Sequence, residues 1–233
     1  MGTGMIGMQW IIFIGIAVVS WLVQMNLQSK FKKYSKIPTG NGMTGADVAL
    51  KMLHDNGIYD VTVTHTPGHL TDHYNPANKT VNLSEGVYNS NSIMAAAVAA
   101  HECGHAMQHA QGYMPLRIRG SLVPLANLGS TLAWPLILIG LLFTGRSSEM
   151  FLNLGILAFS LAVLFQLVTL PVEFNASGRA VRILGSSGIM YPDEIQGTKK
   201  VLGAAALTYV AAAAASILQL LRLVLLFGNR RND

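Results

Sequence analysis

The chain has 233 residues, of which 51% are hydrophobic and only 12% are charged. A soluble domain usually carries about twice that charged fraction, so the composition argues for a membrane protein with a modest extramembrane domain. The single cysteine, Cys103, excludes an intrachain disulfide. The net charge of +5 does not indicate nucleic-acid binding, because the basic residues adjoin apolar segments, where lipid headgroups are the expected partners.

The first predicted element is a transmembrane anchor within residues 1–28. Its core, Met5–Leu27, is uncharged and exceeds the roughly 20 residues that an α-helix needs to cross a bilayer. This segment lacks the basic leading region and the small-residue cleavage site of a signal peptide. We therefore expect an anchor that is not cleaved.

Residues 29–120 are predicted to form an extramembrane α+β region. Thr44 can cap a helix that runs to about Asn56, and a second, longer helix is expected at Ser92–Ala110. Between them, β-branched residues and turn signals predict a small antiparallel sheet. Its three short strands are expected at Val61–Thr64, Leu70–Tyr74 and Thr80–Leu83.

Two further uncharged stretches, Ser121–Thr144 and Met150–Val172, predict a transmembrane hairpin within residues 121–172. Glu173 is expected to begin a helix through about Leu184, followed by a loop up to residue 200. The last region, residues 201–233, contains the alanine-rich run Val201–Leu221, whose composition favours close helix packing. This run either makes a fourth crossing or lies against the extramembrane region.

The distribution of Lys and Arg predicts the orientation, because cytoplasmic flanks carry an excess of both. With the hairpin crossing twice, Arg146, Arg230 and Arg231 fall on one side of the membrane. The other side receives Lys30, Lys32, Lys33, Lys36, Arg117, Arg119, Arg179, Arg182, Lys199 and Lys200. We therefore expect residues 28–120 and 173–200 in the cytoplasm and the amino terminus outside.

The helix predicted at Ser92–Ala110 contains the sequence HECGH from His101 to His105. Residues four apart lie on one helical face, so both imidazoles can reach one metal ion, and Glu102 on the flank can take a proton from the hydrolytic water. This is the H-E-x-x-H arrangement of zinc hydrolases. A pair of metal-free core histidines is the less favoured alternative, because a buried His-Glu-His cluster is costly to desolvate.

A catalytic zinc site needs a third protein ligand and keeps one position open for water. The longer motif with a glycine and a third histidine is absent, since Gln108 and Gln111 stand at those positions. A remote glutamate is therefore expected. Glu173 is favoured because two crossings separate it from His105, which places both on one side, whereas Glu149 falls on the opposite side.

Two other glutamates are weaker candidates for the third ligand. Glu194 is expected in a loop after Pro192, and Glu85 stands at a helix entrance. The structural alternative for Glu173 itself is an acidic residue in a first helical turn, where the helix dipole favours it.

Several segments resemble the bacterial YugP-like neutral zinc metallopeptidases over nearly the whole chain. The segments that carry the resemblance are Asp72–Pro76, Leu83–Ser84, Val87–Asn89, His101–His109 and Leu170–Ala180. The chain is more distantly similar to the HtpX-like and prenyl-protein proteases, which are membrane metallopeptidases of the gluzincin type. In those families a helix bearing Glu-aromatic-x-Ala-Asp supplies the third ligand. The resemblance implies that role for Glu173, while Ser177 replaces the Asp and can still hydrogen-bond a ligating histidine.

Together the patterns predict a mainly α membrane protein with about four transmembrane helices and a small α+β metallopeptidase domain. The expected activity is a membrane-bound, zinc-dependent endopeptidase with one Zn²⁺ per chain, held by His101, His105 and Glu173. Glu102 is the expected general base. The residue that stabilises the oxyanion is left open among His109, Tyr113, His73 and Arg179.

The expected setting is the cell membrane of a bacterium, with the site on the cytoplasmic side near the membrane surface. Peptides or membrane proteins are the expected substrates, and the lipid bilayer is the expected partner. The alternative function is a metal-binding membrane scaffold or regulator that has lost catalysis. A metal transporter is disfavoured, because the first three apolar stretches lack the polar groups that ions need.

Overall fold

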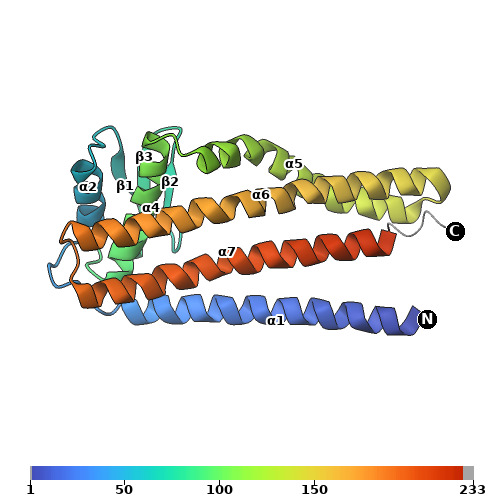
Figure 1. Ribbon diagram of the computed structural model, residues 1–233, viewed down its shortest axis with the longest axis horizontal. Coiled ribbons are helices and arrows are strands. Elements are labelled where there is room, and N and C mark those ends of the chain that lie inside the picture. The colour runs from blue at the N-terminus through green and yellow to red at the C-terminus, as the bar shows by residue number, and fades with distance from the viewer. Residues whose placement is uncertain (1, 228–233) are drawn as a thin grey trace. The chain divides into compact units, whose positions relative to one another are not determined.

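The computed structural model describes the backbone of residues 2–227 and the side chains of residues 10, 11 and 13–227. This part of the chain is mainly helical and contains one small sheet (Figure 1). The elements in chain order are α1 (Gly2–Tyr34), α2 (Gly45–Asp55), β1 (Thr62–Thr66), β2 (His73–Asn75), β3 (Thr80–Ser84), α3 (Glu85–Tyr88), α4 (Ile93–Ala110), α5 (Met114–Leu142), α6 (Gly145–Ser186) and α7 (Pro192–Phe227).

The chain divides into two compact units. One consists of Met1–Leu22, Arg117–Leu170 and Tyr209–Asp233, and the other of Val23–Leu116 and Pro171–Thr208. The second unit contains the whole sheet, α2, α3 and α4, together with the last part of α6 and the first part of α7. It is therefore the unit that carries the HECGH sequence.

Helix α2 begins and ends where the sequence predicts. The Thr44 hydroxyl accepts a hydrogen bond from the backbone N–H of Asp47 at 3.2 Å, and the Asp47 carboxylate accepts one from the backbone N–H of Thr44 at 2.9 Å. This reciprocal pair satisfies amide groups that a helix start leaves free. Gly57, with a φ of 72°, turns the chain away at the other end.

The sheet is mixed, so the prediction of an antiparallel sheet is wrong for one of its two pairings. Strand β3 lies between β1 and β2; it pairs antiparallel with β2 but parallel with β1. The connection from Thr66 to Thr80 is long enough for the crossover that parallel strands require, and β2 lies within it. Strand β2 is also shorter than predicted, since Leu70 has a left-handed φ of 58° that no strand residue adopts.

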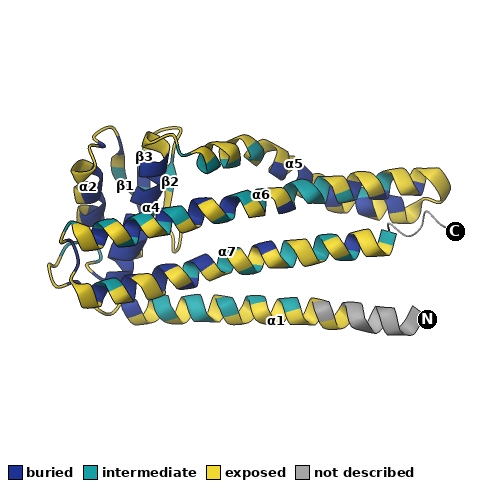
Figure 2. Cartoon of the chain, viewed as in Figure 1, coloured by how far each residue is buried: buried dark blue, intermediate teal, exposed yellow. Residues whose placement is uncertain are grey.

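Helix α4 forms the centre of the second unit and confirms the prediction at Ser92–Ala110. Ser92 caps it by accepting a hydrogen bond from the N–H of Ala95. Its residues are buried along almost the whole length, and Figure 2 shows most of α4 in dark blue beside α2 and the strands. The core that it shares with these elements includes the fully buried Met52, Leu83 and Met107.

Helix α6 continues through Pro171, whereas the sequence predicted a new helix from Glu173. A proline inside a helix removes one backbone hydrogen bond and costs about 3 kcal/mol. A fully buried stripe at four-residue spacing follows it and keeps the helical register: Val172, Ala176, Ala180 and Leu184. Packing against the core thus outweighs the local preference for a break.

The first turn of α7 also differs from the prediction, which placed Glu194 in a loop. Pro192 is the first helical residue, a position where its missing N–H costs nothing. Glu194 is buried, and its carboxylate accepts hydrogen bonds from the backbone N–H groups of Tyr191 at 2.7 Å and Gly40 at 2.6 Å. Glu194 is therefore fully used in joining α7 to the segment that precedes α2.

In the other unit, α5 and α6 form the predicted hairpin around a tight turn at Gly145, whose φ is 63°. The Ser148 hydroxyl donates a hydrogen bond to the Gly140 carbonyl across this turn at 2.6 Å. The two helices approach closely, since a Cβ added to Gly155 would lie 2.6 Å from the Ile137 side chain. Large apolar side chains cover the outer faces, with Leu142 84% exposed.

Three helices in the described part of the chain are long and apolar enough to cross a membrane: α5, α6 and α7. The expectation of about four is thus corrected to three, and the alanine-rich run that the sequence left open lies within α7. The predicted anchor Met5–Leu27 falls on α1, and the side chains of its first residues lie outside the described ones.

A close approach of α4 and α6 at Gly104 sets the geometry of the second unit. A Cβ added at this position would lie 2.6 Å from the backbone carbonyl oxygen of Ala176. Real Cβ atoms do not come that close to a carbonyl, so any larger residue must push the two backbones apart.

We predict that Gly104→Ala lowers stability by about 1–3 kcal/mol, as overpacking in a core does, and that it lowers the zinc content of the purified protein. Thermal unfolding and metal analysis of the full chain in detergent measure both. The matched control is Gly178→Ala on α6, where an added Cβ has open space and alanine favours the helix. Wild-type stability and zinc content in Gly104→Ala would contradict the packing argument.

Candidate metal and catalytic site

Three side chains from two helices meet at one point of the second unit. His101 and His105 project from successive turns of α4, and Glu173 projects from α6. The Glu173 Oε2 atom lies 3.2 Å from His101 Nε2 and 3.6 Å from His105 Nε2. All three are largely shielded, with side-chain exposures of 14%, 10% and 4% for His101, His105 and Glu173.

This cluster fits a tetrahedral metal ion. Zinc is bound by two histidine nitrogens and a carboxylate oxygen at about 2.0–2.2 Å, and tetrahedral ligands at that range lie roughly 3.4 Å from one another. The observed separations of 3.2 and 3.6 Å bracket this value. The three donor atoms lie within 4.8 Å of one another, so His101, His105 and Glu173 could hold one zinc ion and leave a fourth position open.

The other nitrogen of each imidazole has its own polar partner. The Ser177 hydroxyl lies 3.1 Å from His101 Nδ1, and the Gln108 side-chain oxygen lies 3.0 Å from His105 Nδ1. The Gln108 amide group is itself fixed, because its Nε2 donates to the Val172 carbonyl and to Asn175 Oδ1. Gln108 Oε1 can therefore only accept, which puts the proton of His105 on Nδ1 and leaves Nε2 free to bind a metal.

The electrostatic field of the cluster favours positive charge. Burial alone lowers the pKa of His105, but the hydrogen bond to Glu173 and the nearby carboxylates of Glu102 and Glu173 outweigh it and raise this pKa. The same two negative charges that favour an imidazolium would also favour a divalent cation at this position.

Glu102 is buried on the flank of the histidine pair, and its Oε2 accepts a hydrogen bond from the backbone N–H of Tyr74 at 2.9 Å. Tyr74 belongs to β2, the strand at one edge of the sheet. Its hydroxyl makes a second contact with α4, at 2.7 Å from His109 Nδ1. The edge strand is thus attached to the helix of the HECGH sequence at two places.

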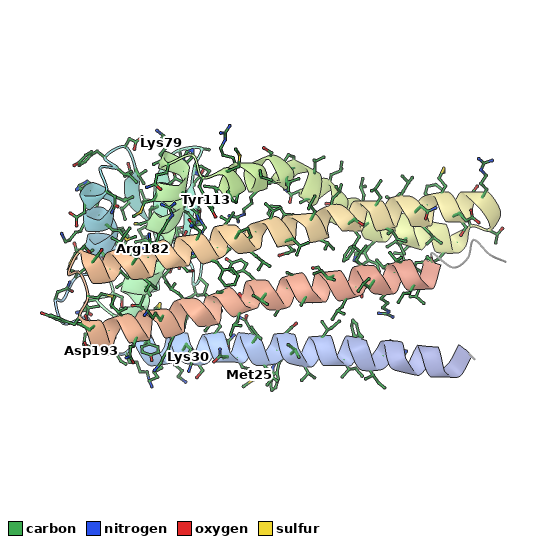
Figure 3. All side chains as sticks on the ribbon, in the orientation of Figure 1. Met25, Lys30, Lys79, Tyr113, Arg182 and Asp193 are labelled. Atoms are coloured by element: carbon green, nitrogen blue, oxygen red, sulfur yellow. The ribbon has the colours of Figure 1, made fainter. Side chains whose placement is uncertain are left out.

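The other predicted candidates lie in different surroundings. Arg179 donates from Nε to Asn175 Oδ1 at 2.7 Å and from Nη1 to Gln111 Oε1 at 2.5 Å, and its guanidinium lies 5.9 Å from the ring centre of Tyr113. Tyr113, labelled in Figure 3, follows the end of α4. His73 is exposed, and its Nδ1 lies 2.8 Å from the Thr71 carbonyl oxygen. The geometry brings His109 into contact with Tyr74 and Arg179 into contact with Gln111, the residue after α4, whereas His73 contacts the Thr71 carbonyl of the loop just before it.

Three residues of the site were not predicted as functional: Tyr74, Gln108 and Asn175. Gln108 follows His105 by three positions and therefore lies next to it on the helix, which is a signal that the sequence contains. The contact of Asn175 with Gln108 and that of Tyr74 with Glu102 depend on tertiary packing, and no local pattern indicates them.

We predict that Ser177→Ala weakens zinc binding about 10- to 100-fold, as loss of a partner of a ligating histidine typically does. Competition with a chelator of known affinity measures the change in the full chain. Ser186→Ala is the matched control, because that hydroxyl contacts only a carbonyl of its own helix. Equal zinc affinities for wild type and Ser177→Ala would contradict a positioning role for this hydroxyl.

Comparison with known proteins gives two matches. The model of a family described as "Putative neutral zinc metallopeptidase" matches residues 9–228. The chain is also 48% identical to the "Putative membrane protease YugP" of Bacillus subtilis (strain 168) over 224 residues, which cover 95% of this chain and 98% of the relative. No solved structure matches the chain.

Proposed function

The chain belongs to this family of neutral zinc metallopeptidases, and from that premise we propose that it is a membrane-bound zinc endopeptidase. The observation that carries the proposal is the convergence of His101, His105 and Glu173, within 4.8 Å of one another, beside the buried carboxylate of Glu102. Two imidazoles and a carboxylate are the protein ligands of several hydrolytic zinc sites, which keep a fourth position for water or substrate.

In the proposed reaction, some side chains of this site bind the metal, others orient the metal ligands, and Glu102 transfers the proton. His101, His105 and Glu173 would hold the zinc ion, with Ser177 and Gln108 fixing the two rings. When bound, zinc supplies Lewis-acid polarisation of the scissile carbonyl and lowers the pKa of water to about 7. Glu102 takes the proton of the attacking water and passes it to the leaving amine.

The Tyr74–His109 pair supports a refinement of the oxyanion hypothesis. His109 lies one turn beyond His105 on α4, and the Tyr74 hydroxyl lies 2.7 Å from its Nδ1. Among the four candidates from the sequence, His109 is the one held by a hydrogen-bonded partner that also contacts Glu102 through its backbone. We therefore favour His109 over His73, whose Nδ1 contacts only the Thr71 carbonyl of the loop just before it in the described hydrogen bonds.

The membrane part of the proposal rests on the apolar surfaces of the other unit. Helices α5, α6 and α7 are long enough to cross a bilayer, and few of their apolar side chains are buried within the protein. On a soluble monomer, apolar side chains exposed along three whole helices would cause the protein to associate with itself or with other proteins. We propose the lipid bilayer as their partner, with the zinc site on the cytoplasmic side and peptides or membrane proteins as substrates.

We predict that Glu102→Gln retains zinc but lowers the rate of peptide cleavage by about 10²–10⁴-fold, the usual contribution of a general base. The assay uses the purified full chain in detergent with a library of quenched fluorescent peptides, beside metal analysis. Glu173→Ala is the companion variant, in which both zinc and cleavage should be lost. Cleavage by Glu102→Gln at the wild-type rate would exclude Glu102 as the base.

The same experiment separates the endopeptidase from its alternative. A zinc-loaded wild-type protein that cleaves no peptide in the library would favour a metal-binding scaffold or regulator. In that case Glu102→Gln and the wild type would be indistinguishable in both measurements.

For the orientation, we predict that an epitope inserted after Ser147, in the first turn of α6, is accessible to antibody on intact spheroplasts. An epitope inserted after Ala77, in the turn between β2 and β3, should be accessible only after permeabilisation. The reverse pattern would invert the orientation, and accessibility of both from one side would contradict the two crossings of the hairpin.

A further inference from the structure

A cavity of the same unit includes Asp72, the residue before the edge strand β2, and contains none of the residues of the metal site. It measures about 250 Å³ and lies between the last part of α1, the loop before β2, and the beginning of α3 and α4. Its apolar walls come from Leu27, Phe31, Leu70, Val87 and Met94. The side chains of Val87 and Met94 are buried.

Polar residues also line the cavity: Gln28, Lys32, Ser35 and His69 are exposed to solvent, and Asp72 is the partly buried charged group among them. Asp72 lines the cavity, but its two carboxylate oxygens accept hydrogen bonds from the Ser84 backbone N–H at 2.7 Å and the Ser84 hydroxyl at 2.9 Å. A carboxylate used in this way does not select a basic ligand. The cavity therefore suits a large apolar group, and engineered apolar cavities of about 150 Å³ already bind benzene.

The position of the cavity relative to β2 indicates that the apolar group it binds is a side chain of the substrate. Asp72 precedes the edge strand and stands two residues before Tyr74, whose backbone N–H points to Glu102. Two strand residues span roughly 6.6 Å. A polypeptide that runs past Tyr74 to reach Glu102 would thus carry a side chain to this cavity within about two residues of Tyr74.

The loop before β2, which lines the cavity, has an unusual backbone. Leu70 adopts a left-handed φ of 58°, which large side chains rarely do, and its side chain is 60% exposed. Such conformations cluster at ligand-binding sites. Here the conformation leaves an apolar side chain that lines the cavity largely exposed to solvent, where a bound apolar group could cover it.

On the basis of the proposed endopeptidase function, we propose that this cavity is a specificity pocket. It binds a large apolar side chain, such as leucine or phenylalanine, at one position within three residues of the bond that is cleaved. The occupant is the substrate polypeptide itself, because Asp72 of the cavity directly precedes β2, the strand whose Tyr74 N–H contacts the general base.

The test uses pairs of quenched fluorescent peptides that differ only by Leu or Ala at each of the three positions on either side of the cleaved bond. The full chain in detergent should prefer Leu by about 10- to 100-fold in kcat/KM at one of these positions, the discrimination expected from burying several methylene groups. Gly86→Phe should fill the cavity, since Gly86 lines it and an added Cβ there has open space. The Leu-to-Ala ratio should then fall to near one.

Gly203→Phe is the matched control, because it adds the same side chain to open space on α7, outside the cavity, and the ratio should stay at the wild-type value. Leu70→Asn gives a second variant that tolerates the left-handed backbone, and it should lower the Leu-to-Ala ratio several-fold.

Zinc content reports whether each variant is folded. Cleavage without any preference, or a wild-type ratio in both Gly86→Phe and Leu70→Asn, would overturn the pocket alone. A wild type that cleaves no peptide would overturn the proposed function and this inference with it.

Discussion

The close approach of α4 and α6 is the constraint on which the site depends. It is possible because position 104 has no side chain and because Ala176 faces it from the other helix. Only at this separation can the carboxylate of Glu173 lie within 3.2 and 3.6 Å of the two imidazole nitrogens. The sequence HECGH therefore specifies two things at once, the polar groups of the site and the distance to the helix that completes it.

The polar groups around the cluster are arranged to orient it. His101 and His105 each use Nδ1 for a protein partner and turn Nε2 to Glu173. Gln108 has one possible orientation, because α6 occupies both hydrogens of its amide group. Preorganisation of this kind lowers the cost of binding a metal ion and fixes its position relative to the neighbouring carboxylate of Glu102.

Local signals predicted much of this structure. The predicted cap Thr44 and the predicted helix Ser92–Ala110 are both confirmed. The resemblance to YugP-like metallopeptidases is confirmed by the family match and by the relative from Bacillus subtilis. The parallel pairing of β1 with β3 was missed because alternating residues look alike in either direction. Pro171 misled the prediction because the packing that keeps α6 helical is tertiary. The hydrogen bond from the Tyr74 N–H to Glu102 could not be predicted from the sequence either, because it joins a strand to a helix distant in the chain.

Cys103 lies inside the HECGH sequence, yet it faces away from the histidines. Its Sγ donates a hydrogen bond to the Ala49 carbonyl on α2 at 3.6 Å, and burial raises the pKa of the thiol, with the Glu102 carboxylate adding to the rise. A buried, protonated thiol is a poor nucleophile. The sequence contains no other cysteine that could react. The rate at which an alkylating reagent modifies Cys103 therefore reports how often α2 separates locally from α4, the helix of the HECGH sequence.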